Sequence, residues 1–302
     1  MADCPKIVLT GPTGWIGAGI LAHLANRFCG GWQDNVRLFG TSARTVSAPD
    51  GSSLVMRPLD EIDGEATRDA IVIHLAYLTK EKVELVGERR FMDTNLAIDD
   101  AVLAAISAGQ PRFVFVASSG AAALAAAGSN RHPYGLSKLR QEDRFLELAA
   151  SKNFPVLIGR IYNLSGPYIN KLESYAISNF LGQARKTGKI TIEARVPVFR
   201  SFLHIDNLSQ LIVEAGIRAL GFLKPIDMCG AQTMEMSDIA SAVVALVPGT
   251  TIARSPIDWT RPSAYLGNFT ETKILSMQLD VALVAFSEQV ADTARWMEKI
   301  ER

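Results

Sequence analysis

Cysteine is scarce in this sequence. Three cysteines occur among 302 residues, Cys4, Cys29 and Cys229, and they form neither a CxxC pair nor a cluster with histidine. Such spacing argues against a disulfide framework and against a zinc site. We therefore expect no bound metal, and a reduced, cytoplasmic setting is the simplest interpretation.

An excess of either charge and a long hydrophobic run are also missing. Lys plus Arg and Asp plus Glu number 31 each, so the formal net charge is +0. Without a basic excess, we expect neither nucleic acid nor an anionic membrane as a partner. The Ala-rich stretch 121–127 is too short to span a bilayer. A strand-like run at 6–10 leaves no room for a signal peptide.

What the sequence does contain is an alternation of strand-like and helical patterns. The helical patterns cover 15–28, 81–108 and 134–151. The expected strands are 6–10, 35–39, 53–57, 70–75, 112–117 and 155–160. This alternation predicts an α/β fold with a Rossmann-type, doubly wound parallel sheet. After about residue 163 prolines become frequent, which predicts a smaller, loop-rich region after the sheet.

The first strand runs directly into a glycine-rich turn and a helical pattern. Gly11-Pro12-Thr13-Gly14-Trp15-Ile16-Gly17 is a GxxGxxG motif. Glycines let backbone N–H groups approach a pyrophosphate, and the following helix N-terminus adds partial positive charge. The motif predicts dinucleotide binding by Gly11, Thr13, Gly14, Trp15, Ile16 and Gly17; a purely structural turn is the alternative.

The end of the second strand bears on cofactor choice. An Asp or Glu there would hold the ribose of NAD, but none occurs between Asp34 and Asp50. Thr41, Ser42 and Arg44 could instead hold a 2′-phosphate. NADP(H) is therefore favoured and NAD(H) is possible, unless Arg44 is a solvated loop charge. Asp60, after the third strand, could meet the adenine or cap a turn.

A YxxxK motif, Tyr134 to Lys138, places a phenol and an ammonium on one helix face. The ammonium favours the phenolate, so Tyr134 could exchange a proton near neutral pH while hydride moves. The strand at 112–117 ends in Ser118-Ser119, where parallel sheets place ligands. Ser119 could polarise the substrate oxygen, with Ser118 as its competitor. A helix-surface tyrosine is the alternative.

These motifs, in this order, resemble the extended short-chain dehydrogenase/reductases, specifically the NAD-dependent epimerase/dehydratase group that acts on nucleotide-activated sugars. The resemblance also covers residues 73–76, 160–167 and 200–207 and the pair Arg261-Pro262. It implies a dinucleotide-binding Rossmann domain at 1–163 that also receives about 201–221. A mainly substrate-binding, discontinuous region would occupy 164–302.

The resemblance also implies roles for individual residues. Ser119, Tyr134 and Lys138 would be catalytic. Further cofactor contacts would come from Leu75, Ala76, Tyr77, Asn95, Tyr134, Lys138 and Tyr162. Substrate contacts would come from Ser118, Ser119, Asn163, Arg200 and Arg261, with the two arginines holding a nucleotide diphosphate. His204 would support the fold, and His74 would be a packed residue beside the cofactor and not a catalyst.

One departure from the family narrows the reaction. The 4,6-dehydratases of this group carry an acidic pair after the catalytic hydroxyl, where this chain has Gly120-Ala121. We therefore favour an NADP(H)-dependent reductase of a 4-keto nucleotide sugar. A nucleotide-sugar epimerase and a non-catalytic NADP-binding regulator are the alternatives. The helices at about 81–108 and 134–151 correspond to a dimer interface in relatives, so we expect a homodimer.

Overall fold

The computed structural model describes residues 4–28 and 30–301, so Cys29 lies outside the described residues. The chain divides into two compact units. The first comprises Met1–Ile161 and Ser209–Asp227, and the second comprises Tyr162–Leu208 and Met228–Arg302.

An eight-stranded sheet forms the centre of the first unit. Its order is β12-β7-β6-β5-β1-β2-β4-β3. The strands are β1 (Ile7–Thr10), β2 (Val36–Gly40), β3 (Arg44–Ser47), β4 (Ser53–Pro58), β5 (Ile71–His74), β6 (Phe113–Ser119), β7 (Val156–Ile161) and β12 (Ile226–Met228). From β7 to β4 every adjacent pair is parallel, and β3 is antiparallel to β4. Strand order reverses at β1, between β2 and β5, which is the doubly wound arrangement predicted from the sequence.

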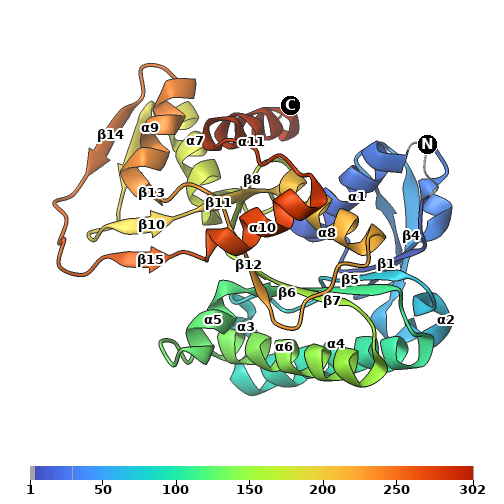
Figure 1. The fold of residues 1–302 in the computed structure, drawn as a ribbon. Helices are drawn as coiled ribbons and strands as arrows, with labels where there is room; N and C mark the ends of the chain where they lie inside the picture. The colour runs from blue at the N-terminus through green and yellow to red at the C-terminus, as the bar shows by residue number, and fades with distance from the viewer. Residues whose placement is uncertain (1–3, 29, 302) are drawn as a thin grey trace. The chain divides into compact units, whose positions relative to one another are not determined.

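Helices cover both faces of this sheet (Figure 1). One face carries α4 (Glu88–Gly109) and α6 (Pro133–Lys152), and the other carries α1 (Trp15–Phe28) and α8 (Ile205–Ile217). Arg27 of α1 and Glu214 of α8 form an ion pair of 2.9 Å. The shorter helices of this unit are α2 (Gly64–Thr67), α3 (Lys82–Val86), α5 (Gly120–Ala126), η1 (Trp32–Asn35) and η2 (Leu59–Glu61).

The central strands are buried along their whole length. Every residue of β1, β5 and β6 is buried, as expected for strands covered on both faces. Their buried polar side chains, Thr10, His74, Ser118 and Ser119, all lie at the carboxyl ends. Because parallel strands share one carboxyl edge, this polar edge is where a ligand site is expected.

The second unit contains more regular structure than its proline content predicted. Its helices are α7 (Ala176–Thr187), α9 (Met236–Leu246), α10 (Phe269–Leu279), α11 (Phe286–Ile300) and η3 (Leu172–Ser174). Its strands form the sheets β13-β10-β15, β11-β8 and β14-β9. They span β8 (Asn163–Ser165), β9 (Lys189–Ile192), β10 (Val198–Arg200), β11 (Phe202–His204), β13 (Met234–Glu235), β14 (Thr251–Arg254) and β15 (Ser263–Tyr265). The prolines that suggested loops, such as Pro167 and Pro262, fall in the connections between these elements.

Three local features of the first unit differ from expectation. The predicted helix 81–108 is divided into α3 and α4 at Gly87, whose φ of 81° ends one helix before the next begins. The Ala-rich stretch forms α5, and the Ser119 side chain caps it by accepting a hydrogen bond from the Ala121 N–H. Residues 44–47 form the edge strand β3, which puts Arg44 at a strand start.

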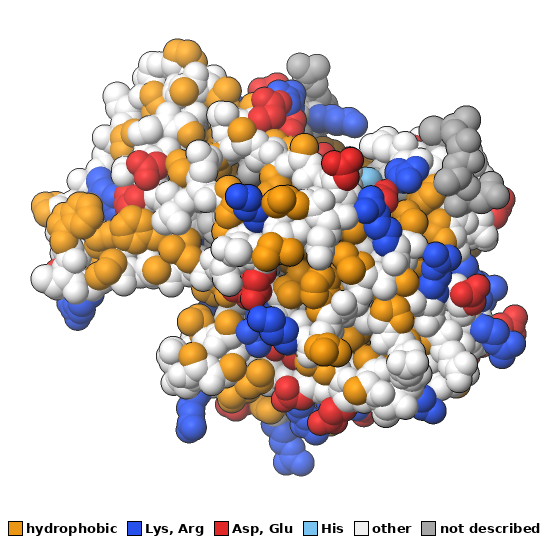
Figure 2. Space-filling view, viewed as in Figure 1, with side chains coloured by type: hydrophobic (Ala, Val, Ile, Leu, Met, Phe, Trp, Pro, Cys, Tyr) orange, Lys and Arg blue, Asp and Glu red, His pale blue; other side chains and the backbone are white. Residues whose placement is uncertain are grey.

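The surface carries charges of both signs. On the face in Figure 2, basic and acidic side chains are interspersed with apolar ones. This mixture agrees with the formal net charge of +0. Within residues 4–28 and 30–301, none of the helices has the length and apolar character needed to cross a membrane.

Candidate active site

The glycines of the loop after β1 have different surroundings. Gly11 has a φ of +69°, and a Cβ there would lie 2.9 Å from the Ala76 backbone nitrogen. A Cβ on Gly17 would lie 2.5 Å from the Gly11 carbonyl oxygen. At Gly14 the nearest atom would be 3.6 Å away, which is ordinary contact. The fold thus requires glycine at the first and third positions, whereas Gly14 leaves an open surface that a ligand could approach.

The N-terminus of α1, the helix that follows this loop, favours binding of an anion. Trp15, its first residue, is buried, Ile16 is half-buried and Thr13 is exposed in the loop itself. The first turn of α1 contains no acidic residue, so no carboxylate competes for its partial positive charge. These residues fit a cofactor pyrophosphate.

Thr10 joins this loop to the end of β5. Its hydroxyl oxygen accepts hydrogen bonds from the Leu75 and Ala76 N–H groups at 3.0 and 3.1 Å. The same hydroxyl lies 2.8 Å from Nδ1 of His74. Leu75 and Ala76, two of the expected cofactor contacts, are therefore fixed beside Gly11.

The residues expected to recognise the adenosine end lie at the carboxyl ends of β2 and β4. Gly40 pairs with Pro58 in the parallel register, so Thr41 and Ser42 leave the sheet beside η2, which contains Asp60. Thr41, Ser42, Arg44 and Asp60 are all exposed, and they are available to a ligand.

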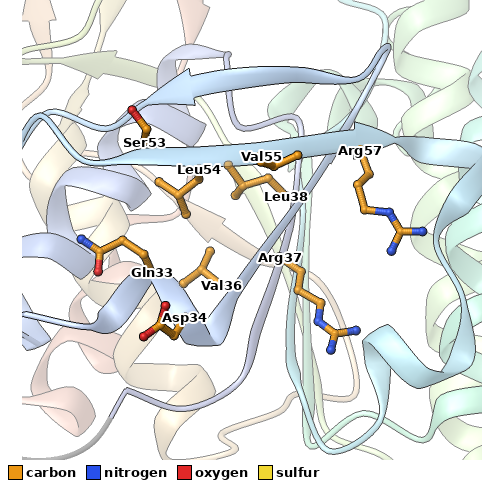
Figure 3. Close-up of a pocket in the computed structure, with 9 residues that line it drawn as sticks. All are labelled: Gln33, Asp34, Val36, Arg37, Leu38, Ser53, Leu54, Val55 and Arg57. Carbon is orange, nitrogen blue, oxygen red and sulfur yellow. The ribbon is translucent and has the colours of Figure 1, made fainter.

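A shallow hollow of about 330 Å³ is lined by residues of the same two strands and of η1 (Figure 3). Arg37 of β2 and Arg57 of β4 are among the residues that line it. Arg57 is paired with Glu61 at 2.9 Å. None of the expected site residues lines this hollow.

Tyr134 and Lys138 lie one turn apart in α6. Pro133 begins this helix, and Nδ1 of His132 caps it by accepting from the Tyr134 N–H. A Cβ on Gly135 would lie 2.7 Å from the Ala121 carbonyl oxygen, so α6 packs closely against α5. This packing brings the start of α6 to the carboxyl end of β6. Tyr134 is half-buried and Lys138 is buried.

The Lys138 ammonium contacts a backbone carbonyl, a side-chain amide and an aromatic ring. It donates to the Ala117 carbonyl oxygen at 2.7 Å and to Oε1 of Gln141 at 2.9 Å. It also lies 3.5 Å from the centre of the Tyr77 ring. Tyr77 in turn meets the Tyr134 ring edge-on, with centroids 6.4 Å apart. Tyr77 therefore contacts both members of the YxxxK motif.

Burial controls the protonation of these groups. It lowers the pKa of Lys138 from 10.5 to about 7, although the carboxylates of Asp99 and Glu142 oppose this effect. Burial also raises the pKa of Tyr77, and the charge of Asp99 adds to that effect. Tyr77 consequently stays a neutral phenol in the range where Lys138 titrates.

The two serines at the end of β6 have different partners. Ser118 donates to Oε1 of Glu142 at 2.5 Å, and Arg160 donates to both oxygens of the same carboxylate at 2.9 and 2.7 Å. Ser119 instead lies at the start of α5. The Ser118 hydroxyl is thus committed to a buried polar cluster, and Ser119 is the better placed of the two for a substrate.

Asn95 of α4 fixes the backbone beyond β5. Its Oδ1 accepts from the Leu78 N–H at 2.8 Å. Its buried Nδ2 has no hydrogen-bond partner among the described residues. A buried donor without a partner is costly, which makes Nδ2 a candidate for a bound water or ligand.

Ser118 and Ser119 belong to the first unit, whereas the other expected substrate residues, Asn163, Arg200 and Arg261, belong to the second. Asn163 donates to the Ser201 carbonyl oxygen at 3.2 Å. Arg200 is half-buried, and burial lowers its pKa. Its guanidinium lies 6.0 Å from the Tyr265 ring, which also packs against Tyr162 at 4.9 Å. Arg200 and Tyr162 are thus grouped around one aromatic ring.

Arg261 has different surroundings from Arg200. Arg200 pairs with Tyr265 in the β10–β15 register, and Arg261 lies in a bend before β15. The Arg261 side chain is 83% exposed and is paired with Asp258 at 3.3 Å. The positive charge of Arg261 is therefore already shared with a carboxylate.

His74 and His204, the two histidines to which no catalytic role was assigned, are both buried. Nε2 of His204 lies 3.3 Å from the Asp292 carboxylate. Gly166 packs directly on the same ring, where a Cβ would lie 2.5 Å from Nε2. His74 belongs to the hydrogen-bonded cluster around Thr10. In the part of the chain that the structure describes, no cluster of three or more His, Cys, Asp or Glu could hold a metal ion.

Sequence analysis did not single out Asp99, Gln141 or Glu142, which surround Lys138. A signal was available, since Asp99 follows Asn95 by one turn on the buried face of α4. Gln141 and Glu142 likewise follow Lys138 by three and four residues on the buried face of α6. Polar residues at core-facing positions of a helix indicate a buried network.

Known proteins resemble this chain in sequence and in fold. Residues 7–218 match the NAD dependent epimerase/dehydratase family. The dTDP-L-rhamnose 4-epimerase of Burkholderia thailandensis is 25% identical over 299 residues, covering 81% of this chain and 82% of that protein.

Solved structures share the fold over nearly the whole chain. The UDP-N-acetylglucosamine 4-epimerase from Methanobrevibacter ruminantium M1, in complex with UDP-N-acetylmuramic acid, has a TM-score of 0.79 at 17% identity. That match covers 99% of this chain and 100% of the other. MoeE5 in complex with UDP-glucose and NAD has a TM-score of 0.72 at 19% identity and covers 100% of both chains.

Proposed function

The chain belongs to the NAD dependent epimerase/dehydratase family and is an enzyme of the extended short-chain dehydrogenase/reductase type, and we propose that it reduces a 4-keto nucleotide sugar with NADP(H). The observation that carries this proposal is the grouping of Ser119, Tyr134 and Lys138 at the carboxyl end of β6 with no acidic residue from 120 to 133. An elimination would need an acid and a base at that place. The reduction of a carbonyl to an alcohol needs no such acid and base after Ser119.

Each residue has a defined task in this reaction. When bound, the reduced nicotinamide supplies hydride to the keto carbon. The Ser119 hydroxyl donates a hydrogen bond to the carbonyl oxygen, and the Tyr134 phenol transfers its proton to that oxygen as the alcohol forms. The positive charge of Lys138 stabilises the tyrosinate left behind. Tyr77 cannot replace Tyr134 as the acid, because burial holds its pKa above the ordinary value.

The cofactor site we propose follows the carboxyl ends of β1, β2 and β5. The open surface at Gly14 and the start of α1 would hold the pyrophosphate. Arg44, with Thr41 and Ser42, would hold a 2′-phosphate, which underlies the preference for NADP(H). Asp60 would meet the adenine. Asn95 and Tyr162 would contact the nicotinamide end.

Arg200 is the stronger of the two proposed diphosphate ligands. Its Nη1 donates to backbone carbonyls of Phe199 and Ser263 at 2.8 and 3.5 Å, and three further N–H donors remain on Nε and Nη2. Arg261 already shares its charge with Asp258. Asn163 would contact the sugar.

Epimerisation is the second candidate, favoured by the similarity to a dTDP-L-rhamnose 4-epimerase. Tyr134 would first accept and then return a proton, with Ser119 and Lys138 in the same roles. A bound oxidised nicotinamide would take up the hydride and give it back after the keto sugar has turned over in the site. A non-catalytic NADP-binding regulator is less well supported, because it leaves the buried ammonium beside Tyr134 without a task.

Net oxidation of NADPH by a 4-keto nucleotide sugar tests the proposal. A loss of NADPH absorbance that equals the amount of alcohol formed supports a reductase. Interconversion of two 4-hydroxy sugars without net oxidation, by protein that retains nicotinamide on purification, supports the epimerase instead.

A reduced cytoplasmic setting and a homodimer complete the proposal. Burial raises the pKa of the Cys4 thiol to about 11, and Cys229 is buried. Both thiols are therefore poorly reactive, which suits a protein that keeps its cysteines reduced.

A further inference from the structure

We propose that Gln141 and Asp99, supported by His74, position the Lys138 ammonium beside Tyr134. This inference rests on the proposed function, because it assigns a task to residues around the same lysine. It concerns three side chains from three elements: β5, α4 and α6.

The connection is continuous and short. Lys138 donates to Oε1 of Gln141 at 2.9 Å. Nε2 of Gln141 donates to Oδ1 of Asp99 at 2.6 Å. The same oxygen lies 3.2 Å from Nε2 of His74. All four residues are 4% exposed or less, so water does not compete with these bonds.

The direction of each hydrogen bond is fixed by its neighbours. The Thr10 oxygen already accepts from two backbone N–H groups, so its own proton is directed to Nδ1 of His74. His74 must then carry its proton on Nε2 and donate it to Asp99. Gln141 can satisfy both Lys138 and Asp99 in one amide orientation. The cluster therefore has a single consistent arrangement, which holds Gln141 rigidly.

Asp99 is the carboxylate left to balance the buried ammonium. The other carboxylate near Lys138, Glu142 of α6, is bound by the Arg160 guanidinium of β7. The remaining ionisable groups around this point are Tyr77 after β5, His74 of β5, and Tyr134 and Arg140 of α6. Of these, Arg140 and His74 cannot carry a negative charge, and burial raises the pKa of Tyr77 so that it stays a neutral phenol.

A purely stabilising role fits this cluster poorly. Buried ionic and polar groups commonly stabilise a fold no better than apolar residues of the same size. What the cluster supplies is a fixed orientation. Gln141 accepts a hydrogen bond from one N–H of the ammonium and the Ala117 carbonyl accepts from another. The direction of the third N–H is thereby determined.

The test is a pH titration of the Lys138 side chain by NMR of protein labelled with ¹⁵N at lysine Nζ. The Lys138 signal is assigned by its loss in Lys138→Met. Asp99→Asn keeps the shape and the acceptor oxygen but removes the charge. Gln141→Leu breaks the connection. Asp100→Asn is the matched control, because Asp100 is the next residue of α4 and pairs with Arg144 at the surface.

We expect Asp99→Asn and Gln141→Leu each to lower the titration midpoint of Lys138 by about one pH unit, since an opposite charge or acceptor is lost. Asp100→Asn should leave it unchanged. The alkaline limb of the kcat/KM profile should move down with the midpoint, because the reaction needs a charged lysine. An unchanged midpoint in both folded variants would overturn the proposal.

The positioning role and the proposed reaction can be contradicted independently of each other. A shifted midpoint in a protein that shows no turnover of keto sugars supports the positioning role and contradicts the proposed reaction. Normal turnover with an unshifted midpoint in both variants contradicts the positioning role alone. Asp99→Asn is nearly isosteric, so its folding is readily checked by a thermal melt.

Discussion

The ammonium of Lys138 lies 3.5 Å from the centre of the Tyr77 ring. This contact places an aromatic face where water would otherwise hydrate the charge. A cation–π contact with a buried cation contributes about 2 kcal/mol or somewhat more, whereas lowering a pKa from 10.5 to about 7 corresponds to about 5 kcal/mol. Dehydration therefore outweighs the aromatic attraction, and Lys138 loses its proton more easily than a surface lysine.

This buried lysine makes the stability of the fold depend on pH. The unfolded chain binds the Lys138 proton up to about pH 10.5, whereas the folded chain releases it near pH 7. Between these values the unfolded state holds more protons, so the free energy of unfolding rises with pH. From pH 7 to pH 9 the expected gain is about 2–3 kcal/mol.

Denaturant unfolding of the wild type and Lys138→Met at the two pH values measures this gain. The variant should lack it, because it has no proton to lose. An identical pH dependence in both proteins would contradict the burial of a charged lysine.

Gly14 and Gly17 should respond differently to the same substitution. Gly17→Ala forces a Cβ to within 2.5 Å of backbone, so we expect a loss of stability of about 1–3 kcal/mol. Gly14→Ala meets nothing closer than 3.6 Å and should leave the melting temperature unchanged. It should nevertheless weaken NADPH binding about tenfold or more, because the methyl group occupies the ligand's approach. Calorimetric titration with NADPH and a thermal melt separate the two effects, and unaltered NADPH binding by Gly14→Ala would reject the phosphate loop as assigned.

Arg44 should determine the choice between the two nicotinamide cofactors. A charge-assisted hydrogen bond contributes about 1.5–3 kcal/mol, so Arg44→Ala should weaken NADPH binding about 10- to 100-fold and leave NADH binding unaltered. The control is Arg37→Ala, because Arg37 is an exposed arginine on the preceding strand, β2. If the wild type binds NADH more tightly than NADPH, the role given to Arg44 is wrong.

The helices α4 and α6 give a prediction about assembly. We expect them to form a two-fold interface, and light scattering at micromolar concentration should give twice the chain mass of 32.7 kDa. Arg140 is exposed on α6, so Arg140→Glu should weaken such an interface. A monomer in the wild type would contradict it.

Much of the fold could be predicted because it depends on local patterns. The helix 15–28 matches α1 to the residue, and each expected strand of the sheet lies within one residue of its observed start. These segments have strong periodicity and clear turn residues. The edge strand β3 was missed because four residues with one buried side chain give little pattern.

The surroundings of Lys138 could not be predicted in the same way. YxxxK and the following Glu142 are local, but Asp99 lies 42 residues before Gln141 in the chain. Which buried polar groups meet depends on how α4 and α6 pack on the sheet. The identity of the Tyr77 contact depends equally on the course of the chain after β5. Sequence spacing identifies such residues as candidates, and tertiary packing decides their partners.

The most direct test of the account is the rate of NADPH oxidation by a 4-keto nucleotide sugar in the wild type and in Tyr134→Phe. Removing the phenol's proton should lower kcat by about 10²- to 10⁴-fold, while the Kd for NADPH stays within about twofold because the ring remains. Turnover by Tyr134→Phe at the wild-type rate would contradict the role of Tyr134 and, with it, the proposed reaction.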